Sequence, residues 1–384
     1  MREIKFLAFY NTPDNPENHI ISPAASTKVG YLINALENTK RPVEVITGSR
    51  PYPRTGNPKI EKQLNDYAKL VIMPEIRGGG WFANKVSSLV YYIRYIGYLM
   101  RHIRKEDIVI VYHSLQNMKL VELLKKWIGF CLILEVEEIY GDVMQSQKTV
   151  HREMRYFQCA DGYIFPTELL NQKVNTSRKP YVVAHGTYQV EAKEIGAFPQ
   201  TQEKTVRCVY AGTFDPAKGG VMAAISAAEH LPENYHMHIL GFGSSDEVKR
   251  VEDFINTTAE RCRCGLTYDG CLSGDAYKQF IQSCDIGLST QNPSAMFNDT
   301  SFPSKVLSYM ANGLRVVSVR IPVVEESAVG DLVSYYDEQT PERIAKAIMQ
   351  IDLTRPYDSR ARLSELDVQF REALNALVTE LMIE

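Results

Sequence analysis

Two segments of this chain have the pattern of a strand, a loop and a helix, and each carries a lysine at the turn. In "SFPSKVLSYMANGLRVVS" (Ser301–Ser318), a Pro and a Ser-Lys pair open an apolar helix that stops at Gly313, just before a β-branched strand. In "VYAGTFDPAKGG" (Val209–Gly220), an apolar strand runs into Gly212, and a loop containing Lys218 leads to a helix. The first N–H groups of a helix favour an anion, and a lysine adds a full positive charge. The pair therefore predicts one diphosphate held between the two turns.

Each motif alone also has a purely structural interpretation. Strand–glycine–helix turns occur in every α/β protein, and a lysine near the start of a helix is usually solvated. The order and spacing of the two motifs favour the binding interpretation. We predict that Lys218 and Lys305 flank the diphosphate, with backbone amides near Gly212 and Ser304 as further donors.

With these motifs, the region 205–350 resembles the donor half of a GT-B glycosyltransferase, most nearly glycosyltransferase family 4. That family typically has a strand followed by "GR(L/F)…KG", then a strand ending in "GxG", then "F/Y-x-G", then "EAMAxGxPVV". The parallels here are "GTFDPAKG" at Gly212–Gly219, "ILGFG" at Ile239–Gly243, "YDG" at Tyr268–Gly270 and "SYMANGLRVVS" at Ser308–Ser318. The resemblance implies an α/β fold of two Rossmann-like domains facing a central cleft, with a C-terminal helix that crosses back to the first domain.

The chain also departs from that family. Thr213 stands where the family commonly has an arginine. Thr300 and Ser308 stand where the family has a pair of glutamates, the second of which holds the donor ribose. Ser304-Lys305 resembles the "P-S-K-x-x-E-Y" variant of bacterial relatives that assemble polysaccharides. The donor-binding residues that the resemblance implies are Gly212, Thr213, Lys218, Gly241, Gly243, Ser304 and Lys305.

Length and composition limit the other possibilities. A chain of 384 residues is long for one hydrophobic core, so two domains are expected. The formal net charge of −3 argues against a nucleic-acid-binding protein. Seven cysteines are too few for a disulfide scaffold, and the spacing of Cys262, Cys264, Cys271 and Cys284 fits no common zinc motif.

Short apolar runs alternate with helical patterns along both halves of the chain, which indicates parallel, doubly wound sheets. The expected helices of the first half lie at about Ser26–Glu37, Ile60–Tyr67, Val86–Arg104, Leu115–Lys126 and Thr149–Cys159. The predicted organisation is an N-terminal acceptor-binding domain (1–190), a linker (191–204), a nucleotide-sugar-binding domain (205–355) and a C-terminal helical segment that packs back on the first domain (356–384).

Polar side chains follow the fourth and fifth strands expected in the first domain. The fourth strand ends in Tyr112-His113-Ser114, and the fifth runs into a segment with three glutamates, the last of them Glu138. Ligands bind at the carboxyl ends of such strands. His113 matches a histidine that family 4 often has there, whereas acidic residues replace the family's "HD" or "HE". We therefore take Glu138 and His113 as catalytic candidates that orient the acceptor or stabilise charge on the sugar; solvated surface carboxylates are the alternative.

The segment Lys85–Lys105 combines four tyrosines with arginines and lysines at helical spacing, and Trp81-Phe82 precede it. This pattern is typical of a helix that lies on an anionic membrane surface. The alternative is that the tyrosines pack on the sheet. The N-terminus has the pattern of a first strand rather than a signal peptide, so we expect a cytoplasmic protein, peripheral at the inner face of the plasma membrane.

The function that these observations favour is transfer of a sugar from a UDP- or GDP-linked donor to a glycan or a lipid-linked saccharide. The chain has no Asp-x-Asp motif for a divalent metal, so we expect activity without metal or other cofactor. The family resemblance implies retention at the anomeric carbon. Two alternatives stay open: a non-catalytic GT-B-like protein that binds a nucleotide or glycan, and a GT-B nucleotide-sugar epimerase.

Overall fold

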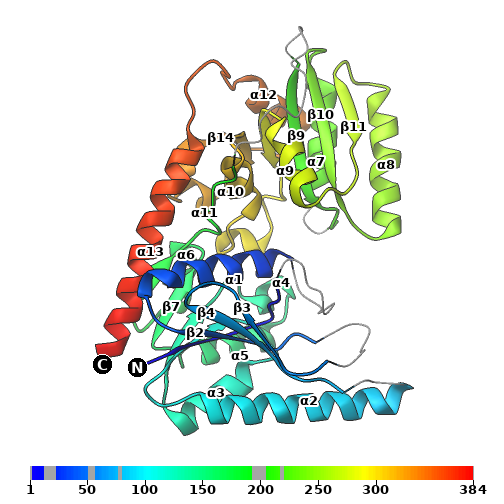
Figure 1. Cartoon of the computed structure of the whole chain (residues 1–384). Helices are drawn as coiled ribbons and strands as arrows, with labels where there is room; N and C mark the ends of the chain where they lie inside the picture. Colours follow the sequence, from blue (N-terminus) through cyan, green and yellow to red (C-terminus); the bar gives the residue numbers. More distant parts are fainter. Residues whose placement is uncertain are drawn as a thin grey trace. The chain divides into compact units, whose positions relative to one another are not determined.

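The computed structural model describes residues 2–12, 23–50, 57–76, 80–192, 205–216 and 220–383. The chain forms two compact units, shown in Figure 1. Unit 1 contains Met1–Thr187 and Val368–Glu384, and unit 2 contains Tyr188–Asp367. Lys218 and residues 193–204 of the expected linker lie outside the described residues.

Unit 1 is built on an eight-stranded sheet with the order β3-β4-β2-β1-β5-β6-β7-β8. All neighbouring strands are parallel except the pair β3 and β4. The central strands are buried along almost their whole length because helices cover both faces of the sheet. The strands are β1 (Ile4–Ala8), β2 (Val43–Thr47), β3 (Ile60–Gln63), β4 (Ala68–Ile72), β5 (Ile108–Tyr112), β6 (Cys131–Glu135), β7 (Gly162–Phe165) and β8 (Tyr181–Val183).

Helices of unit 1 connect these strands as a doubly wound fold requires. They are α1 (Pro23–Ala35), α2 (Gly80–His102), α3 (Met118–Ile128), α4 (Tyr140–Val143), α5 (Gln147–Phe157) and α6 (Glu168–Val174), with a 3₁₀ turn at Leu36–Thr39. Among them, α2, α3 and α5 contribute to one hydrophobic cluster with alternate residues of the central strands. These three helices therefore cover the same face of the sheet.

The prediction of a helix at Ile60–Tyr67 is wrong. Residues Ile60–Gln63 form β3, the antiparallel edge strand beside β4. Their side chains alternate between half-buried and exposed, which is the period of two that a strand requires. The segment is too short for the helical period of 3.6 to be distinguished from this alternation.

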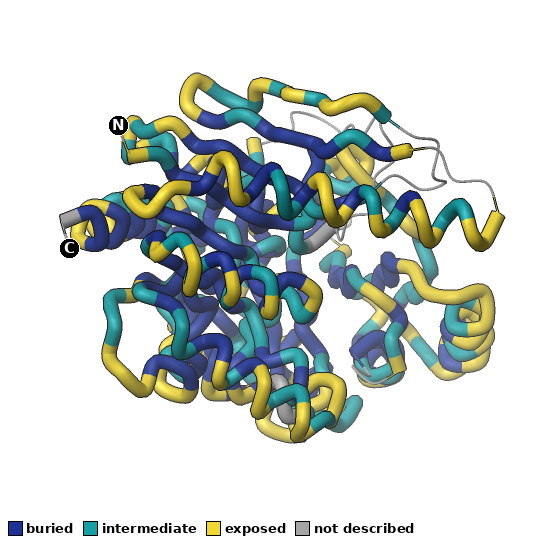
Figure 2. The backbone as a smooth tube through the Cα atoms, turned by 90° about the horizontal axis from the view of Figure 1, so that it is seen from below, coloured by how far each residue is buried: buried dark blue, intermediate teal, exposed yellow. Residues whose placement is uncertain are grey.

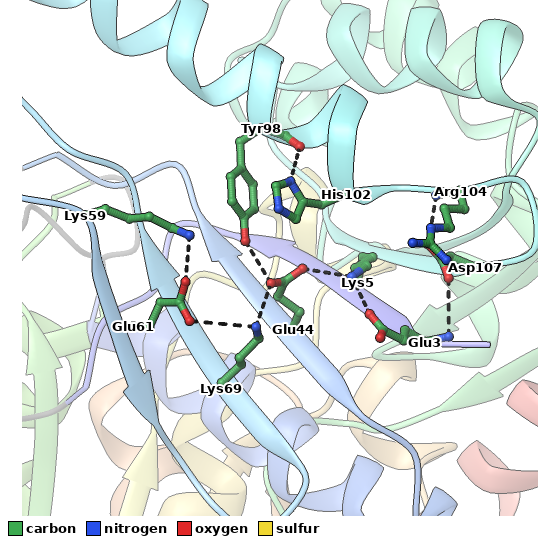
Figure 3. Close-up of polar contacts among 10 residues, drawn as sticks. All are labelled: Glu3, Lys5, Glu44, Lys59, Glu61, Lys69, Tyr98, His102, Arg104 and Asp107. Atoms are coloured by element: carbon green, nitrogen blue, oxygen red, sulfur yellow. Dashed lines mark hydrogen bonds and ion pairs between the residues drawn. The ribbon is translucent and has the colours of Figure 1, made fainter. Parts of the chain in front are cut away.

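The inner face of α2 is anchored to the sheet by tyrosines and a charged network. Tyr91, Tyr95 and Tyr98 are buried, so the interpretation in which the tyrosines pack on the sheet is correct for these three, whereas Tyr92 is 48% exposed. The hydroxyl of Tyr98 donates to Glu44 Oε1 at 2.8 Å, and Lys5 Nζ donates to Glu44 Oε2 at 2.8 Å, as Figure 3 shows. This anchoring fixes which side of α2 faces away from the sheet.

Unit 2 holds a six-stranded parallel sheet with the order β11-β10-β9-β12-β13-β14. Its strands are β9 (Val206–Thr213), β10 (Tyr235–Phe242), β11 (Gly265–Tyr268), β12 (Ile286–Ser289), β13 (Arg315–Val319) and β14 (Val333–Tyr336). Its helices are α7 (Gly220–Ala227), α8 (Ser245–Ala259), α9 (Gly274–Gln282), α10 (Ser304–Ala311), α11 (Pro322–Glu325) and α12 (Pro341–Met349), with 3₁₀ turns at Ala228–His230, Met296–Asp299 and Gly330–Leu332.

The last helix, α13 (Ser359–Ile383), belongs to both units. Its first turns are tied to unit 2, where Ser359 Oγ donates to Met310 O at 2.9 Å. Its later residues belong to unit 1, where Phe370 stacks on Tyr31 of α1 with ring centroids 5.6 Å apart. The predicted class, two α/β domains with parallel sheets and a C-terminal helix that returns to the first, is confirmed. None of the helices in the described part of the chain combines the length and the apolar character needed to cross a bilayer.

Candidate functional site

The predicted donor residues of unit 2 meet at the carboxyl edge of its sheet. Gly212 lies near the end of β9, and Lys305 is the second residue of α10. The lysine side chain passes directly over the glycine: a β-carbon at position 212 would lie 2.5 Å from Lys305 Cε and 2.9 Å from Nζ. Lys305 Nζ also lies 5.0 Å from the centre of the Tyr210 ring. The structure thus brings the two lysine-bearing motifs of the sequence into contact.

Helix α10 is held in this place by Tyr309. The Tyr309 hydroxyl accepts a hydrogen bond from Ala211 N of β9 at 2.8 Å and donates to Leu288 O of β12 at 3.4 Å. Its ring packs against Gly287, where any side chain would collide with it. The helix begins at Ser304, directly after Pro303, and Ser304 is exposed. The lysine that follows is therefore fixed at a helix N-terminus, where anions are favoured.

The other predicted glycines lie beside this point, at the end of β10. Gly241 has a φ of 154°, which favours glycine, and a β-carbon there would collide with the carbonyl oxygen of Gly212. The Gly241 carbonyl accepts a hydrogen bond from the Tyr268 hydroxyl at 3.1 Å. Gly243 lies just before α8, against Glu247. The missing side chains leave the backbones of β9 and β10 in close approach.

The residues that depart from family 4 have separate places. Thr213, at the end of β9, is exposed, and Thr300 is buried. The Ser308 hydroxyl lies 3.5 Å from the Tyr277 hydroxyl on the side of α10. Lys218 falls outside the described residues, so its place beside Lys305 remains a prediction.

In unit 1, His113 follows β5 and is almost fully enclosed. Its Nε2 lies 2.8 Å from Oε1 of Glu153, a fully buried carboxyl group on α5. The same carboxyl group accepts hydrogen bonds from Tyr140 N at 3.0 Å and Gly141 N at 2.7 Å, at the start of α4. The ring of His113 packs on Phe157, with centroids 4.8 Å apart. Glu153 thus holds both the histidine and the segment that leads out of β6.

The segment that leads out of β6 carries an acid pair beside a buried lysine. Lys28 of α1 lies with Nζ 3.1 Å from Glu137 Oε1, and it donates to the carbonyl oxygen of Ala184 at 2.8 Å. Glu135, the last residue of β6, is fully buried. Burial and the neighbouring Glu137 hold the pKa of Glu135 well above its usual range. Burial opposes ionisation of Glu137 as well, but the charge of Lys28 and hydrogen bonds from Glu135 and Lys28 outweigh it and lower its pKa.

The raised pKa of Glu135 and the lowered pKa of Glu137 favour a proton on Glu135 beside an ionised Glu137. Tyr112, which pairs with Glu135 across the two strands, lies in the same environment. Burial and the nearby Glu137 and Glu135 raise the pKa of its hydroxyl. Lys28, Glu137 and Glu135 together carry no net charge. A neutral polar cluster of this kind suits a ligand rich in hydroxyl groups.

Glu138, the predicted catalytic carboxylate, is half-buried and stands between this cluster and α4. Several buried polar atoms nearby have no hydrogen-bond partner among the described residues: both carboxyl oxygens of Glu135, His113 Nδ1, Ser114 Oγ and Asn117 Nδ2. An unpaired buried polar atom costs about 1–3 kcal/mol. Their concentration at one edge of the sheet indicates a place for the polar groups of a ligand.

Sequence reasoning missed Lys28, Glu153 and the role of Glu135. Lys28 and Glu153 lie on helices that are distant in sequence from the strand ends that they contact, and nothing in the local pattern of either residue marks it. Glu135 carried a signal, because a glutamate that ends an apolar strand run is unusual. All seven cysteines are free, and among the described residues no group of three or more His, Cys, Asp or Glu side chains is placed to hold a metal ion.

Replacing Glu135 with glutamine should make the protein less sensitive to alkaline pH. A carboxyl group whose pKa is raised by folding keeps its full stability below the unfolded pKa and loses it as the pH rises through the folded pKa. Glutamine does not ionise and still offers an N–H to Glu137. Urea denaturation from mildly acidic to alkaline pH should therefore show wild type losing stability relative to Glu135→Gln. Glu106→Gln, at an exposed position, should follow wild type; an identical pH profile for all three proteins would contradict the neutral state of Glu135.

No family model matches the sequence, and no curated protein matches it. Solved structures match over nearly the whole chain. The E. coli trehalose-6-phosphate structure bound with UDP-2-fluoro glucose is 12% identical, with 99% of each chain covered and a TM-score of 0.65. The UDP-forming alpha,alpha-trehalose-phosphate synthase from Burkholderia xenovorans, in complex with glucose-6-phosphate, is 12% identical, with 100% and 99% covered and a TM-score of 0.65. Sucrose-phosphate synthase from Thermosynechococcus elongatus is 14% identical, with 100% and 97% covered and a TM-score of 0.63. The predicted GT-B fold is confirmed.

Proposed function

We propose that this chain is a glycosyltransferase that moves a sugar from a nucleotide-sugar donor to a saccharide acceptor. The observation that carries the proposal is the position of Lys305 over Gly212, at the N-terminus of α10 and the carboxyl edge of the unit 2 sheet. Phosphate groups are bound at such edges in open α/β sheets. The solved structures with this fold include one bound with UDP-2-fluoro glucose and one in complex with glucose-6-phosphate. UDP- or GDP-linked sugars are the donor class that this supports.

In this proposal, unit 1 binds the acceptor. The cluster of Lys28, Glu135 and Glu137 would accept and donate hydrogen bonds to acceptor hydroxyl groups. Glu138 would orient the attacking hydroxyl. His113, held by Glu153, would help to position the acceptor at the same edge of the unit 1 sheet. The acceptor that we propose is a glycan or a lipid-linked saccharide, in the assembly of a polysaccharide at the cytoplasmic side of a membrane.

Charge on the departing nucleoside diphosphate would be met by Lys305 and the first amides of α10, which are in place before the reaction begins, and by Lys218 as its sequence motif predicts. This chemistry uses no divalent metal, and the family 4 resemblance implies that the acceptor attacks from the face that the nucleotide leaves. We expect turnover to persist in the presence of EDTA, and NMR of the product to show retention at the anomeric carbon. Loss of activity with EDTA and recovery with Mn²⁺ would refute the first claim; an inverted product would refute the second.

A panel of nucleotide sugars separates this function from its alternatives. Incubation should release nucleoside diphosphate from at least one donor, in a transfer or slow hydrolysis reaction. Binding without release would support a non-catalytic nucleotide- or glycan-binding protein, an alternative that rests on Thr213, Thr300 and Ser308 in place of the family's arginine and glutamates. Release together with a 2-epimerised sugar would identify an epimerase instead.

A further inference from the structure

Helix α2 carries an exposed apolar stripe on the side that faces away from the sheet. Its members recur at intervals of three, four and seven residues, so they lie along one side of the helix. They are Phe82 (73% exposed), Val86 (44%), Leu89 (62%), Ile93 (60%) and Met100 (50%). The buried residues Tyr91, Tyr95 and Tyr98 lie on the opposite side. Figure 2 looks onto this side of unit 1 and shows exposed positions recurring along the helix.

The flanks of the stripe carry cations and no anions. Between Gly80 and His102 the helix contains no aspartate or glutamate, whereas Arg94 and Arg101 are exposed on one flank. On the other flank, Lys85 Nζ lies 3.8 Å from the centre of the Trp81 ring, and that ring is 72% exposed. An apolar stripe between cationic flanks, with a tryptophan at one end, is the pattern of a helix that lies in a membrane interface.

Helix α3 continues this surface. It packs on the same face of the sheet as α2, through Val121 and Leu124, so its outer side points away from that face as well. Leu123 and Trp127 are exposed there at 51% and 70%, one helical turn apart, and Lys119 and Lys126 are exposed beside them. Nothing in the sequence pattern had singled out these α3 residues.

We propose that the outer sides of α2 and α3 form one docking surface for an anionic lipid bilayer, defined by Trp81, Phe82, Val86, Leu89, Ile93, Met100, Leu123 and Trp127. The apolar side chains enter the level of the acyl chains, and the flanking cations contact phosphate headgroups. The charge pattern separates this partner from a second copy of the chain, because two such surfaces in contact would bring Arg94 and Arg101 of both copies together. A bilayer supplies the missing negative charge.

This inference deepens the membrane-side location in the proposed function but rests on different residues from the donor and acceptor sites. The two are therefore separable by experiment. Co-sedimentation uses the full chain with phosphatidylcholine vesicles, with or without phosphatidylglycerol. Release of nucleoside diphosphate from the donor panel is measured on the same proteins without vesicles.

Wild type should bind the anionic vesicles at low salt, bind the neutral ones weakly, and detach at high salt because the attraction is screened. Arg94→Gln with Arg101→Gln should weaken binding by about fivefold for each charge removed. Leu89→Gln with Ile93→Gln should weaken it by roughly tenfold or more, because both side chains leave apolar surroundings. Val368→Gln, at an exposed position on α13, is the matched control and should bind as wild type.

Three outcomes would overturn the docking surface: no binding to anionic vesicles, equal binding by wild type and both double variants, or a wild-type dimer that Leu89→Gln with Ile93→Gln converts to a monomer without vesicle binding. Each variant should retain its thermal midpoint, and Trp127→Ser on α3 tests the surface independently of α2. Donor turnover in every variant would show that failure of this inference leaves the transferase proposal intact.

Discussion

Replacing Lys305 with alanine should weaken nucleoside diphosphate binding by roughly tenfold or more, because a charge-assisted contact of this kind contributes about 1.5–3 kcal/mol. The loss of donor turnover should be larger, since the charge on the leaving group grows in the transition state and the cation meets it there. Isothermal titration calorimetry measures the affinity, and release of nucleoside diphosphate measures the turnover.

Lys249→Ala removes an exposed lysine from α8 in the same unit and should change neither quantity. Lys218→Ala should resemble Lys305→Ala if the second motif contributes as its sequence predicts. Glu138→Gln, in the other unit, should reduce turnover by a smaller factor without changing nucleotide affinity. Unchanged affinity in both lysine variants would remove the diphosphate from this edge of the sheet.

Replacing Lys28 with methionine should destabilise the protein by roughly 1–3 kcal/mol, because the half-buried Glu137 and two backbone carbonyl oxygens then lose their cationic partner. The lysine side chain is only 6% exposed, and the carbonyl oxygens of Ala184 and Gly186 lose a donor together with Glu137. Urea denaturation at neutral pH provides the measurement.

The double variant Lys28→Met with Glu137→Gln should recover part of this loss, since the uncompensated charge is then removed as well. Lys119→Met, an exposed change on α3, serves as the control and should alter stability by less than about 0.5 kcal/mol. If Lys28→Met proves as stable as the control, Lys28 does not hold the acid pair in the way proposed.

Most strands of the unit 1 sheet were predictable because they are short, mainly apolar runs bounded by polar turns, whereas β3 was mistaken for a helix. The motif at Ser301–Ser318 also showed where α10 begins, since a proline followed by a polar pair marks a helix N-terminus. The placement of the two lysine-bearing motifs together followed from the rule that parallel strands place their carboxyl ends at one edge. The finer resemblance to glycosyltransferase family 4 stays a prediction.

The parts that sequence could not supply depend on which side of an element faces inward or on contacts across long separations. The tyrosines and the aliphatic residues of α2 are both apolar at helical spacing, so periodicity alone could not decide which set packs on the sheet. Burial assigns the core to Tyr91, Tyr95 and Tyr98. Likewise, Glu153 and His113 are 40 residues apart in the sequence, and no local sequence pattern predicts that they interact.

Helix α13 has a consequence for the order in which the chain folds during synthesis. Unit 1 is discontinuous in sequence: it needs Val368–Glu384, where the side chains of Leu377 and Leu381 pack against Gly162 of β7. Every residue of unit 2 leaves the ribosome before that segment does. Although domains generally fold from the N-terminus during synthesis, here the second unit can be complete while the first still exposes the apolar surface that awaits the final helix. Termination directly after Asp367 would therefore leave the N-terminal unit unfinished, although every residue of the C-terminal unit is present.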